Sequence, residues 1–353
     1  MFGKPKPVVG LDIGSNSVKA VELRPAGRSF KVVAFGSEPI PSDTIVDGAI
    51  IDAGAVADAI RRLLDRHKIK TREVVASLSG NSVIVKKINL PVMTDADLAE
   101  SIHWEAEQYI HFDIQDVNLD YQILTPAPAA DARGGMEVLL VAAKKDKIND
   151  YTEVIKQAGR VPVVMDVDAF AVQNAYEANY DTDSASVVVL LNAGASGINV
   201  NIVSGDQSLF TRDISMGGNA YTEAIQKELG LTFEDAERLK KGESVDGARP
   251  EDVQPILRAV TDNLLLETQK TFDFFKATAA SERIDLILLS GGTSRIEGFS
   301  QMVADRFGTP VEAFDPFRRI QFEGSKFGVE DPAEVAPVSA VAVGLALRRA
   351  GDR

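Results

Sequence analysis

The chain has 353 residues, of which 45% are apolar and 25% are charged, as expected of a soluble globular protein of about two domains. Its formal net charge of −14 repels phosphate backbones and anionic headgroups, which disfavours nucleic-acid binding and polybasic membrane binding. The absence of cysteine excludes disulfides, thiol nucleophiles and zinc–thiolate sites.

The first 80 residues predict a unit of strands with one helix. Short runs rich in Val, Ile and Leu, separated by glycine turns, predict the strands. Val56, Ile60 and Leu63 recur at helical spacing, which predicts an amphipathic helix. The predicted elements are strands at 8–13, 18–23, 30–36 and 73–78 and a helix at 55–67.

Residues 81–160 predict a compact α+β insertion. Thr94 begins a helix, and Asp97 occupies the position of the acid in a capping box. The predicted elements are strands at 83–90, 119–124 and 137–143, the helix from Thr94 and a second helix at 148–158, with a strand at 161–167 after them.

The second half of the chain starts over with the same kind of strand order. A run of strands around a glycine turn is followed by helices and then by another buried strand. The predicted elements are strands at 186–191, 198–203, 208–214 and 284–289, a helix that follows Gly217-Gly218 and ends near Gly230, and helices at 232–241, 252–278, 298–307 and 336–348.

A weak internal repeat relates residues 12–21 to residues 192–201, because each has a polar residue at a strand end, a glycine turn and a second strand. Glycine turns point successive N–H groups outward and form a cradle for anions. Each turn alone would be an ordinary hairpin, but two matching copies favour two lobes facing each other across a cleft. Asp12 is placed to hold a water of Mg²⁺, and Lys19 to contact a phosphate.

Other chemistry-bearing residues do not predict a second site. The histidines, His67, His103 and His111, have no further ligand near them in sequence. The aromatic residues around Trp104 predict core or groove lining, and Ser290 lacks the G-x-S-x-G turn of a hydrolase. Neither glycine turn is a Walker A loop, and no apolar run has the length of a signal peptide or membrane span.

Longer motifs carry a family resemblance. ILLSGGTSRIEG at Ile287–Gly298, together with LDIGSNSVKAVEL at Leu11–Leu23, resembles the actin-like ATPase superfamily of actin, sugar kinases and FtsA. Ser77–Pro91 (SLSGNSVIVKKINLP) and Ile102–Leu124 (IHWEAEQYIHFDIQDVNLDYQIL) resemble the PilM family of type IV pilus assembly proteins. The fold that this implies is α/β: two RNase H-like lobes around a nucleotide cleft, with an FtsA/PilM-type α+β subdomain inserted in the first lobe.

The resemblance also implies a division into domains. The first lobe core would comprise residues 1–80, completed by 161–181 and 336–353, and residues 81–160 would form the inserted subdomain. The second lobe core would comprise residues 182–215 and 282–335, and residues 216–281 its helical subdomain.

The resemblance implies ATP or ADP with Mg²⁺ in the cleft. Asp12 would meet the metal through a water molecule, and the two glycine turns would hold the phosphates from opposite sides. The residues that match the family motifs are Asp12, Gly14, Ser15, Asn16 and Lys19 in the first phosphate motif, Asn192, Gly194, Ala195, Ser196, Gly217 and Gly218 in and after the second, and Glu237, Lys240, Gly291, Gly292, Thr293 and Arg295 around adenosine.

Two residues differ from the superfamily pattern. Asn192 stands where Asp is usual, so it supplies no charge near the metal. Asp168 stands where chaperone relatives have the Glu that orients the attacking water, and its side chain is one methylene shorter. Since phosphoryl transfer depends on positioning and charge, we expect slow or absent ATP turnover, with Asp12 and Asp168 as the candidate catalytic residues.

By its resemblance, the chain is expected to be a cytoplasmic adaptor of the type IV pilus platform, acting in twitching motility. It would bind the N-terminal cytoplasmic peptide of the membrane protein PilN in a nucleotide-dependent way, and so lie at the inner membrane through that partner without inserting into it. Other platform proteins and the pilus motor ATPases are further expected partners. The alternatives are a slow ATPase, a small-molecule kinase, a filament-forming protein like FtsA and a type II secretion homologue.

Overall fold

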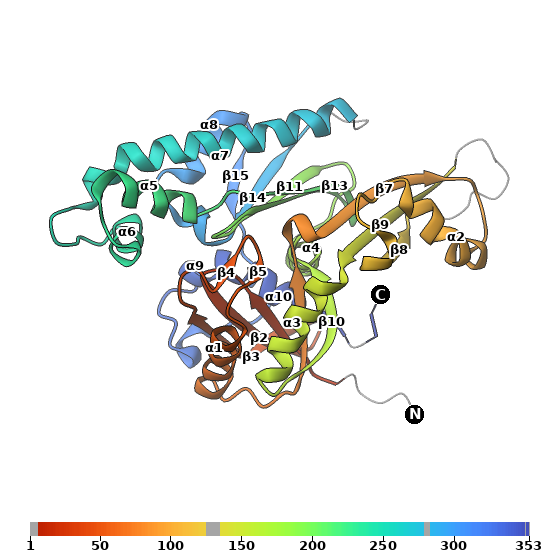
Figure 1. The fold of residues 1–353 in the computed structure, drawn as a ribbon, viewed down its shortest axis with the longest axis horizontal. Helices are drawn as coiled ribbons and strands as arrows, with labels where there is room; N and C mark the ends of the chain where they lie inside the picture. Colours follow the sequence, from red (N-terminus) through yellow and green to blue (C-terminus); the bar gives the residue numbers. More distant parts are fainter. Residues whose placement is uncertain (1–5, 125–134, 279–282, 350, 353) are drawn as a thin grey trace.

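The computed structural model describes residues 6–124, 135–278, 283–349 and 351–352. Two five-stranded sheets form its two lobes (Figure 1). The first has the order β3-β2-β1-β6-β10, and the second has the matching order β13-β12-β11-β14-β15. The strands are β1 (Val9–Ile13), β2 (Ser17–Ala26), β3 (Ser29–Pro39), β6 (Glu73–Leu78), β10 (Val161–Val167), β11 (Val187–Ala193), β12 (Ile198–Ser204), β13 (Gln207–Ile214), β14 (Leu286–Ser290) and β15 (Val311–Ala313).

The two lobes repeat the same strand pairing. β1 pairs antiparallel with β2 and parallel with β6, and β11 pairs antiparallel with β12 and parallel with β14. This shared arrangement confirms the two-lobed actin-like fold that the sequence repeat and the motifs predicted.

Two helices fill the space between the sheets: α4 (Asp168–Asn179) and α10 (Ala340–Ala346). They cross so closely that a Cβ on Gly344 would lie 1.6 Å from the carbonyl oxygen of Ala171, which only glycine permits. The helix predicted over residues 336–348 is interrupted by the 3₁₀ turn η5 (Pro337–Ser339), since a proline in a helix interior would remove a backbone donor.

The outer faces of the sheets are covered by other helices. α1 (Ala53–Arg66) and α3 (Lys145–Gln157) pack on the first sheet, and Asp52 caps α1 by accepting from the N–H of Ala55. The helices over the second sheet are α5 (Asn219–Leu229), α6 (Phe233–Lys240), α7 (Pro250–Thr278) and α8 (Phe299–Phe307). The remaining short elements are β4 (Ile45–Val46), β5 (Ala49–Ile50), α9 (Pro332–Val335), η1 (Gly80–Ser82), η2 (Ile114–Asp116), η3 (Gly292–Arg295) and η4 (Gly324–Phe327).

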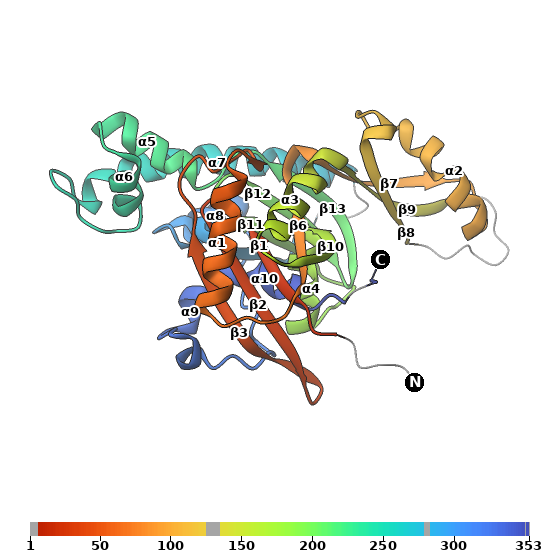
Figure 2. The same ribbon diagram turned by 60° about the horizontal axis from the view of Figure 1, so that its bottom comes forward.

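A third sheet, in the order β7-β9-β8, projects from the lobes at the end opposite α5 and α6 (Figure 2). Its elements are β7 (Val83–Leu90), α2 (Asp95–Glu107), β8 (Val117–Ile123) and β9 (Met136–Lys144). It has a core of its own, and the capping box predicted for Thr94 and Asp97 is present at the start of α2.

Packing places two segments differently from the predicted domain division. α3 lies within the predicted insertion, yet its Tyr151 and Ile155 are buried in the core of the first lobe with α1. Phe317 and Phe322, from the predicted second lobe, pack against Phe35 of β3 with ring centroids 6.3 and 5.1 Å away. Core packing therefore favours ending the insertion near β9 and adding the Phe317–Phe322 segment to the first lobe, while the division as a whole stays a prediction.

Across the described ranges, no helix combines the length and the apolar character that a membrane span requires.

Candidate functional site

A cavity of about 760 Å³ lies between the two lobes. It forms where the inward faces of both sheets change from apolar to polar. Val188 and Leu190 of β11 pack between the lobes, and Asn192, the next residue on that face, lines the cavity. Every predicted site residue except Gly217 lines this cavity, so the structure brings the two halves of the predicted site together.

The first glycine turn connects β1 and β2. The N–H of Gly14 donates to the carbonyl oxygen of Ser17 at 3.2 Å and closes the turn. Asp12 and Lys19 lie directly opposite each other on the two strands, and the Lys19 ammonium donates to Asp12 Oδ2 at 3.0 Å. Both side chains are largely shielded from solvent, with exposed fractions of 14% for Asp12 and 19% for Lys19, so the ion pair forms part of the cavity wall.

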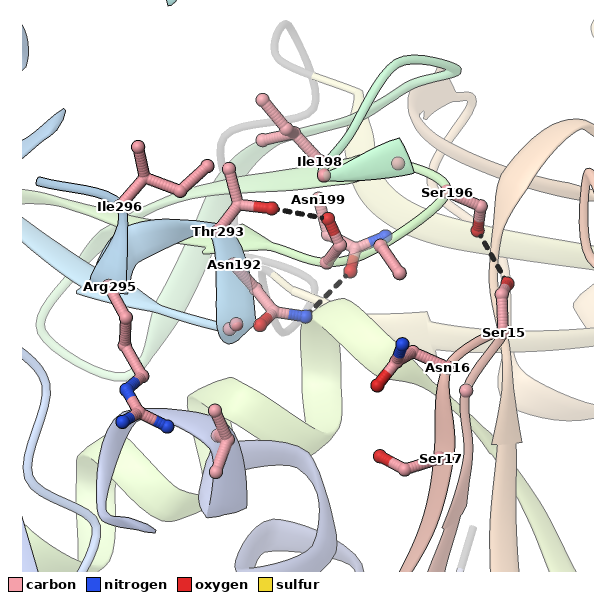
Figure 3. A pocket seen from close by; sticks show the side chains of 18 of the residues that line it. Ser15, Asn16, Ser17, Asn192, Ser196, Ile198, Asn199, Thr293, Arg295 and Ile296 are labelled. Atoms are coloured by element: carbon pink, nitrogen blue, oxygen red, sulfur yellow. Dashed lines mark hydrogen bonds between the residues drawn. The ribbon is translucent and has the colours of Figure 1, made fainter. Parts of the chain in front are cut away.

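The second glycine turn connects β11 and β12 in the same way. The N–H of Gly194 donates to the carbonyl oxygen of Gly197 at 2.8 Å. Ser15 of the first turn donates from its hydroxyl to the hydroxyl of Ser196 at 2.8 Å, a bond that crosses from lobe to lobe (Figure 3). The two predicted phosphate turns therefore touch each other.

Glycines behind the second turn hold it in place. A Cβ on Gly217 would lie 2.6 Å from the carbonyl oxygen of Gly194, so Gly217 supports the turn from outside the cavity. Gly291 has φ +86°, and a Cβ there would lie 2.2 Å from the carbonyl oxygen of Ala193. Thr293 donates to the carbonyl oxygen of Gly194 at 2.7 Å, which ties the predicted adenosine motif to the phosphate turn.

Two cavity residues, Asn199 and Asp213, escaped the sequence prediction. Asn192 donates to Asn199 Oδ1 at 2.9 Å, and Asn199 donates to Asp213 Oδ1 at 2.8 Å. Each is a polar residue in a predicted strand that contains other polar residues as well, so the sequence contains no specific signal for it. Burial raises the pKa of Asp213, although bonds from Asn199 and the Gly80 N–H oppose that rise.

Asp168 begins α4 at the floor of the cavity. Burial, with the Asp12 carboxylate adding to it, raises the pKa of Asp168 to about 6, while a bond from Ser77 opposes the rise. The Ser77 hydroxyl donates to Asp168 Oδ1 at 2.5 Å. A carboxyl group with a pKa near neutrality can exchange a proton at physiological pH. In Asp168, one of the two carboxyl oxygens already accepts the hydrogen bond from Ser77.

Glu237 and Lys240 of α6 form an ion pair at the opposite wall of the cavity. Thr222 donates to Glu237 Oε2 at 2.7 Å, and Lys240 donates to the carbonyl oxygen of Gly218 at 3.2 Å. Burial raises the pKa of Glu237, but Lys240 and Thr222 more than offset it and the pKa ends below its usual value. Glu237 is thus held as a carboxylate beside the second turn, while burial lowers the pKa of Lys240 although the Glu237 charge opposes that shift. Arg295 extends from η3 into the same cavity (Figure 3).

The lining fits a phosphate-bearing ligand that carries a cation. Lys19, Lys240 and Arg295 bring positive charge, and the two turns bring glycine backbone that oxygen atoms can approach. Asp12 and Asp168 face the same space, and a cation between them and a phosphate would offset their negative charge. No cluster of three His, Asp or Glu side chains suited to a metal is found in the described ranges, so such a cation would keep water and phosphate oxygens as ligands.

A family model and a solved structure both match the same family. A family model described as type IV pilus assembly protein PilM matches residues 10–350. A solved structure described as the PilM–PilN type IV pilus biogenesis complex is similar with a TM-score of 0.86 and 30% sequence identity, and the match covers 97% of this chain and 98% of that one.

More distant similarity extends to other proteins of the same fold. Cell division protein FtsA of Enterococcus hirae is 23% identical over 351 residues, which is 87% of this chain and 78% of that protein. FtsA of Bacillus subtilis is 21% identical over 254 residues, and the match spans only 57% of its length. MreB5 of Spiroplasma citri, solved with ADP, has a TM-score of 0.54 at 14% identity, over 96% of this chain and 94% of that one, and shows the shared fold alone.

Proposed function

The chain belongs to the family of the type IV pilus assembly protein PilM, and from that premise we propose that it is a nucleotide-binding adaptor of the pilus assembly platform. The observation that carries the proposal is the match over nearly the whole chain to the structure of a PilM–PilN complex. The partner would be the N-terminal cytoplasmic peptide of PilN, and the protein would lie in the cytoplasm at the inner membrane through that peptide.

The cavity between the lobes would hold ATP or ADP with Mg²⁺. Backbone donors of the two glycine turns would bind the phosphates, with the Lys19 ammonium beside them, and Asp12 would bind the metal through water. Glu237, Lys240 and Arg295 would bind the nucleoside from the wall formed by α6 and η3. The bound metal would supply charge neutralisation between the phosphates and the two carboxylates of the cavity floor.

The residues of the cavity favour retention of nucleotide over rapid hydrolysis. Asn192 contributes no charge, and both polar atoms of its amide bond to protein groups, Asn199 and Ser290. Asp168 bonds to Ser77 and has a pKa of about 6, so part of its population is protonated near neutral pH. Any ATPase activity is therefore expected to be slow, and a slow ATPase is the second candidate function.

Nucleotide would affect partner binding by fixing the relative orientation of the two lobes. The peptide groove would lie between the first lobe and the β7-β9-β8 sheet, and the cleft would be closed by nucleotide contacts to both lobes. A ligand changes affinity at a second site only if it binds one arrangement of the lobes better than the other. The Ser15–Ser196 bond shows how near the lobes come at the cavity.

Calorimetry with a synthetic peptide of the PilN cytoplasmic N-terminus tests the proposal. We expect binding that is at least about fivefold tighter with Mg-ATP than without nucleotide, the lower end of typical allosteric coupling. A protein loaded with Mg-ATP, freed of excess nucleotide and held for several hours should still release mainly ATP on denaturation. Equal affinities would contradict the nucleotide dependence, and no peptide binding in either state would contradict the adaptor function.

A further inference from the structure

A row of four polar side chains crosses the second sheet from strand to strand. Ser290 of β14 lies opposite Asn192 of β11, Asn192 lies opposite Asn199 of β12, and Asn199 lies opposite Asp213 of β13. Each neighbour pair is hydrogen-bonded, at 3.2, 2.9 and 2.8 Å. The row thus joins the second glycine turn to the outer strand of the sheet without a break.

The row continues into the other lobe. Asp213 Oδ2 accepts a hydrogen bond from the backbone N–H of Gly80. Gly80 has φ +79° and opens η1, the turn between β6 of the first lobe and β7 of the inserted sheet. β13 also packs beside β7, so this bond lies at the base of the insertion (Figure 1).

The direction of every bond in the row is fixed by the carboxylate at its end. An ionised carboxylate accepts only, so Asn199 must turn its NH₂ group to Asp213 and its oxygen to Asn192. Asn192 must then present an NH₂ group to Asn199. An aspartate at position 192 would place two carboxylates on either side of one amide that can donate to only one of them.

We propose that this row is a positioning device, with Asp213 as its anchor, that carries the arrangement of the second phosphate turn to Gly80 and the base of the inserted sheet. The inference rests on the proposed function where it concerns nucleotide, but the row itself is formed by the chain's own residues alone. It explains why asparagine stands at position 192: the acidic group of the row lies two strands away, at position 213.

Exchanging Asn192 and Asp213 tests the proposal, because the double variant has the same net charge as the wild type. In Asn192→Asp, the row cannot satisfy both carboxylates. In Asp213→Asn, all amides can reverse together, with position 213 donating to Asn199, Asn199 donating to Asn192, and Asn192 donating to the Ser290 hydroxyl. In the double variant, the reversed row ends on the new carboxylate and every bond is made.

Hydrogen exchange of the Gly80 amide is the first readout, measured by NMR on nucleotide-free protein labelled with ¹⁵N-glycine. Asn192→Asp should lower its protection at least about tenfold, because two carboxylates competing for the single amide of Asn199 displace Asp213 from the Gly80 N–H. Asp213→Asn should lower it less than about threefold, and the double variant should return to within about twofold of the wild type. Asp206→Asn, an exposed acid on the turn before β13, is the matched control and should change nothing.

Peptide affinity with and without Mg-ATP is the second readout. Asn192→Asp should reduce the ratio of the two affinities, and the double variant should restore it. A double variant at least as unprotected at Gly80 as Asn192→Asp, or full protection in Asn192→Asp, would overturn the inference. If the wild type shows no effect of nucleotide on peptide affinity, the proposed function fails on that point. The hydrogen-exchange data still decide whether a change at position 192 is transmitted along the row to Gly80.

Discussion

The two lobes have the same strand order but place their charges differently along the cleft. In the first lobe, the strand end carries the acid Asp12, and the residue opposite it is the base Lys19. In the second lobe, the equivalent positions are the amides Asn192 and Asn199, and the acid Asp213 lies one strand further out. The two copies therefore share the backbone of the glycine turn, but only the first has a carboxylate at the strand end.

This asymmetry gives the lobes different tasks in the proposed function. The first lobe presents an ion pair that can reorganise around a cation and a phosphate. The second lobe presents a closed row of hydrogen bonds whose polar atoms bond to one another and to Gly80. We infer that the Asp12–Lys19 pair of the first lobe would hold the cation, and that the row of the second lobe connects its phosphate turn to the base of the inserted sheet.

Removing the first-lobe acid should have the largest effect. Asp12→Ala deletes the only carboxylate proposed for the metal, and the expected loss of Mg-ATP affinity is at least about 100-fold, the size of a lost charge-assisted contact in a partly buried site. Asn192→Ala, its counterpart in the second lobe, should cost less than about tenfold. Calorimetric titration with Mg-ATP measures both, and equal losses would break the comparison.

Alanine in place of a turn glycine should destabilise the protein more in the second lobe than in the first, the reverse of the order expected for nucleotide affinity. A Cβ on Gly217 would press on three backbone atoms of the second turn at 2.6 to 2.7 Å, while a Cβ on Gly14 meets nothing closer than 3.3 Å. Gly217→Ala should therefore destabilise the protein by about 2 kcal/mol, and Gly14→Ala by less than about 1 kcal/mol.

Urea unfolding of the nucleotide-free proteins gives both values. A melting-temperature shift of about 1–2 °C per kcal/mol, which follows from the unfolding entropy of a chain of 353 residues, is an independent check. A Gly14→Ala variant as unstable as Gly217→Ala would mean that backbone atoms pack as closely around the first turn as around the second.

Asp168 should make stability depend on pH. Its pKa is raised from 3.8 to about 6, so the folded state binds more protons than the unfolded state between these values, and stability falls as pH rises through this window. Asp168→Asn removes that cost and keeps an acceptor for Ser77. Since Asp168 faces the cavity and is screened by solvent, we expect a gain of about 1 kcal/mol at pH 7.5 that vanishes near pH 4.

Urea unfolding at several pH values measures this difference, with Asp206→Asn as the exposed control. A gain in the Asp168→Asn variant that stays constant from pH 4 to pH 7.5 would show that burial does not raise the pKa of Asp168.

The sequence predicted most of the fold because its signals were local or repeated. The strand alternation, the capping box at Thr94 and the repeat at Asp12 and Asn192 are all visible within short windows. Asn199 and Asp213 were missed because a polar residue within a strand does not indicate a site until its neighbours across the sheet are known. Packing of α3 and of the Phe317–Phe322 segment was missed for the same reason, since both depend on contacts with distant parts of the chain.

The smallest expected effect lies where the lobes meet. Ser15→Ala and Ser196→Ala each remove the same hydroxyl–hydroxyl bond, so each should cost about 0.5–1 kcal/mol of stability in nucleotide-free protein. The double variant should cost little more than either single variant, because neither remaining hydroxyl is buried and water can satisfy it. A coupling free energy of about 0.5 kcal/mol in this double-mutant cycle would show that the bond forms in solution. Strict additivity would mean that this bond does not form in solution and that the two glycine turns do not touch without a ligand.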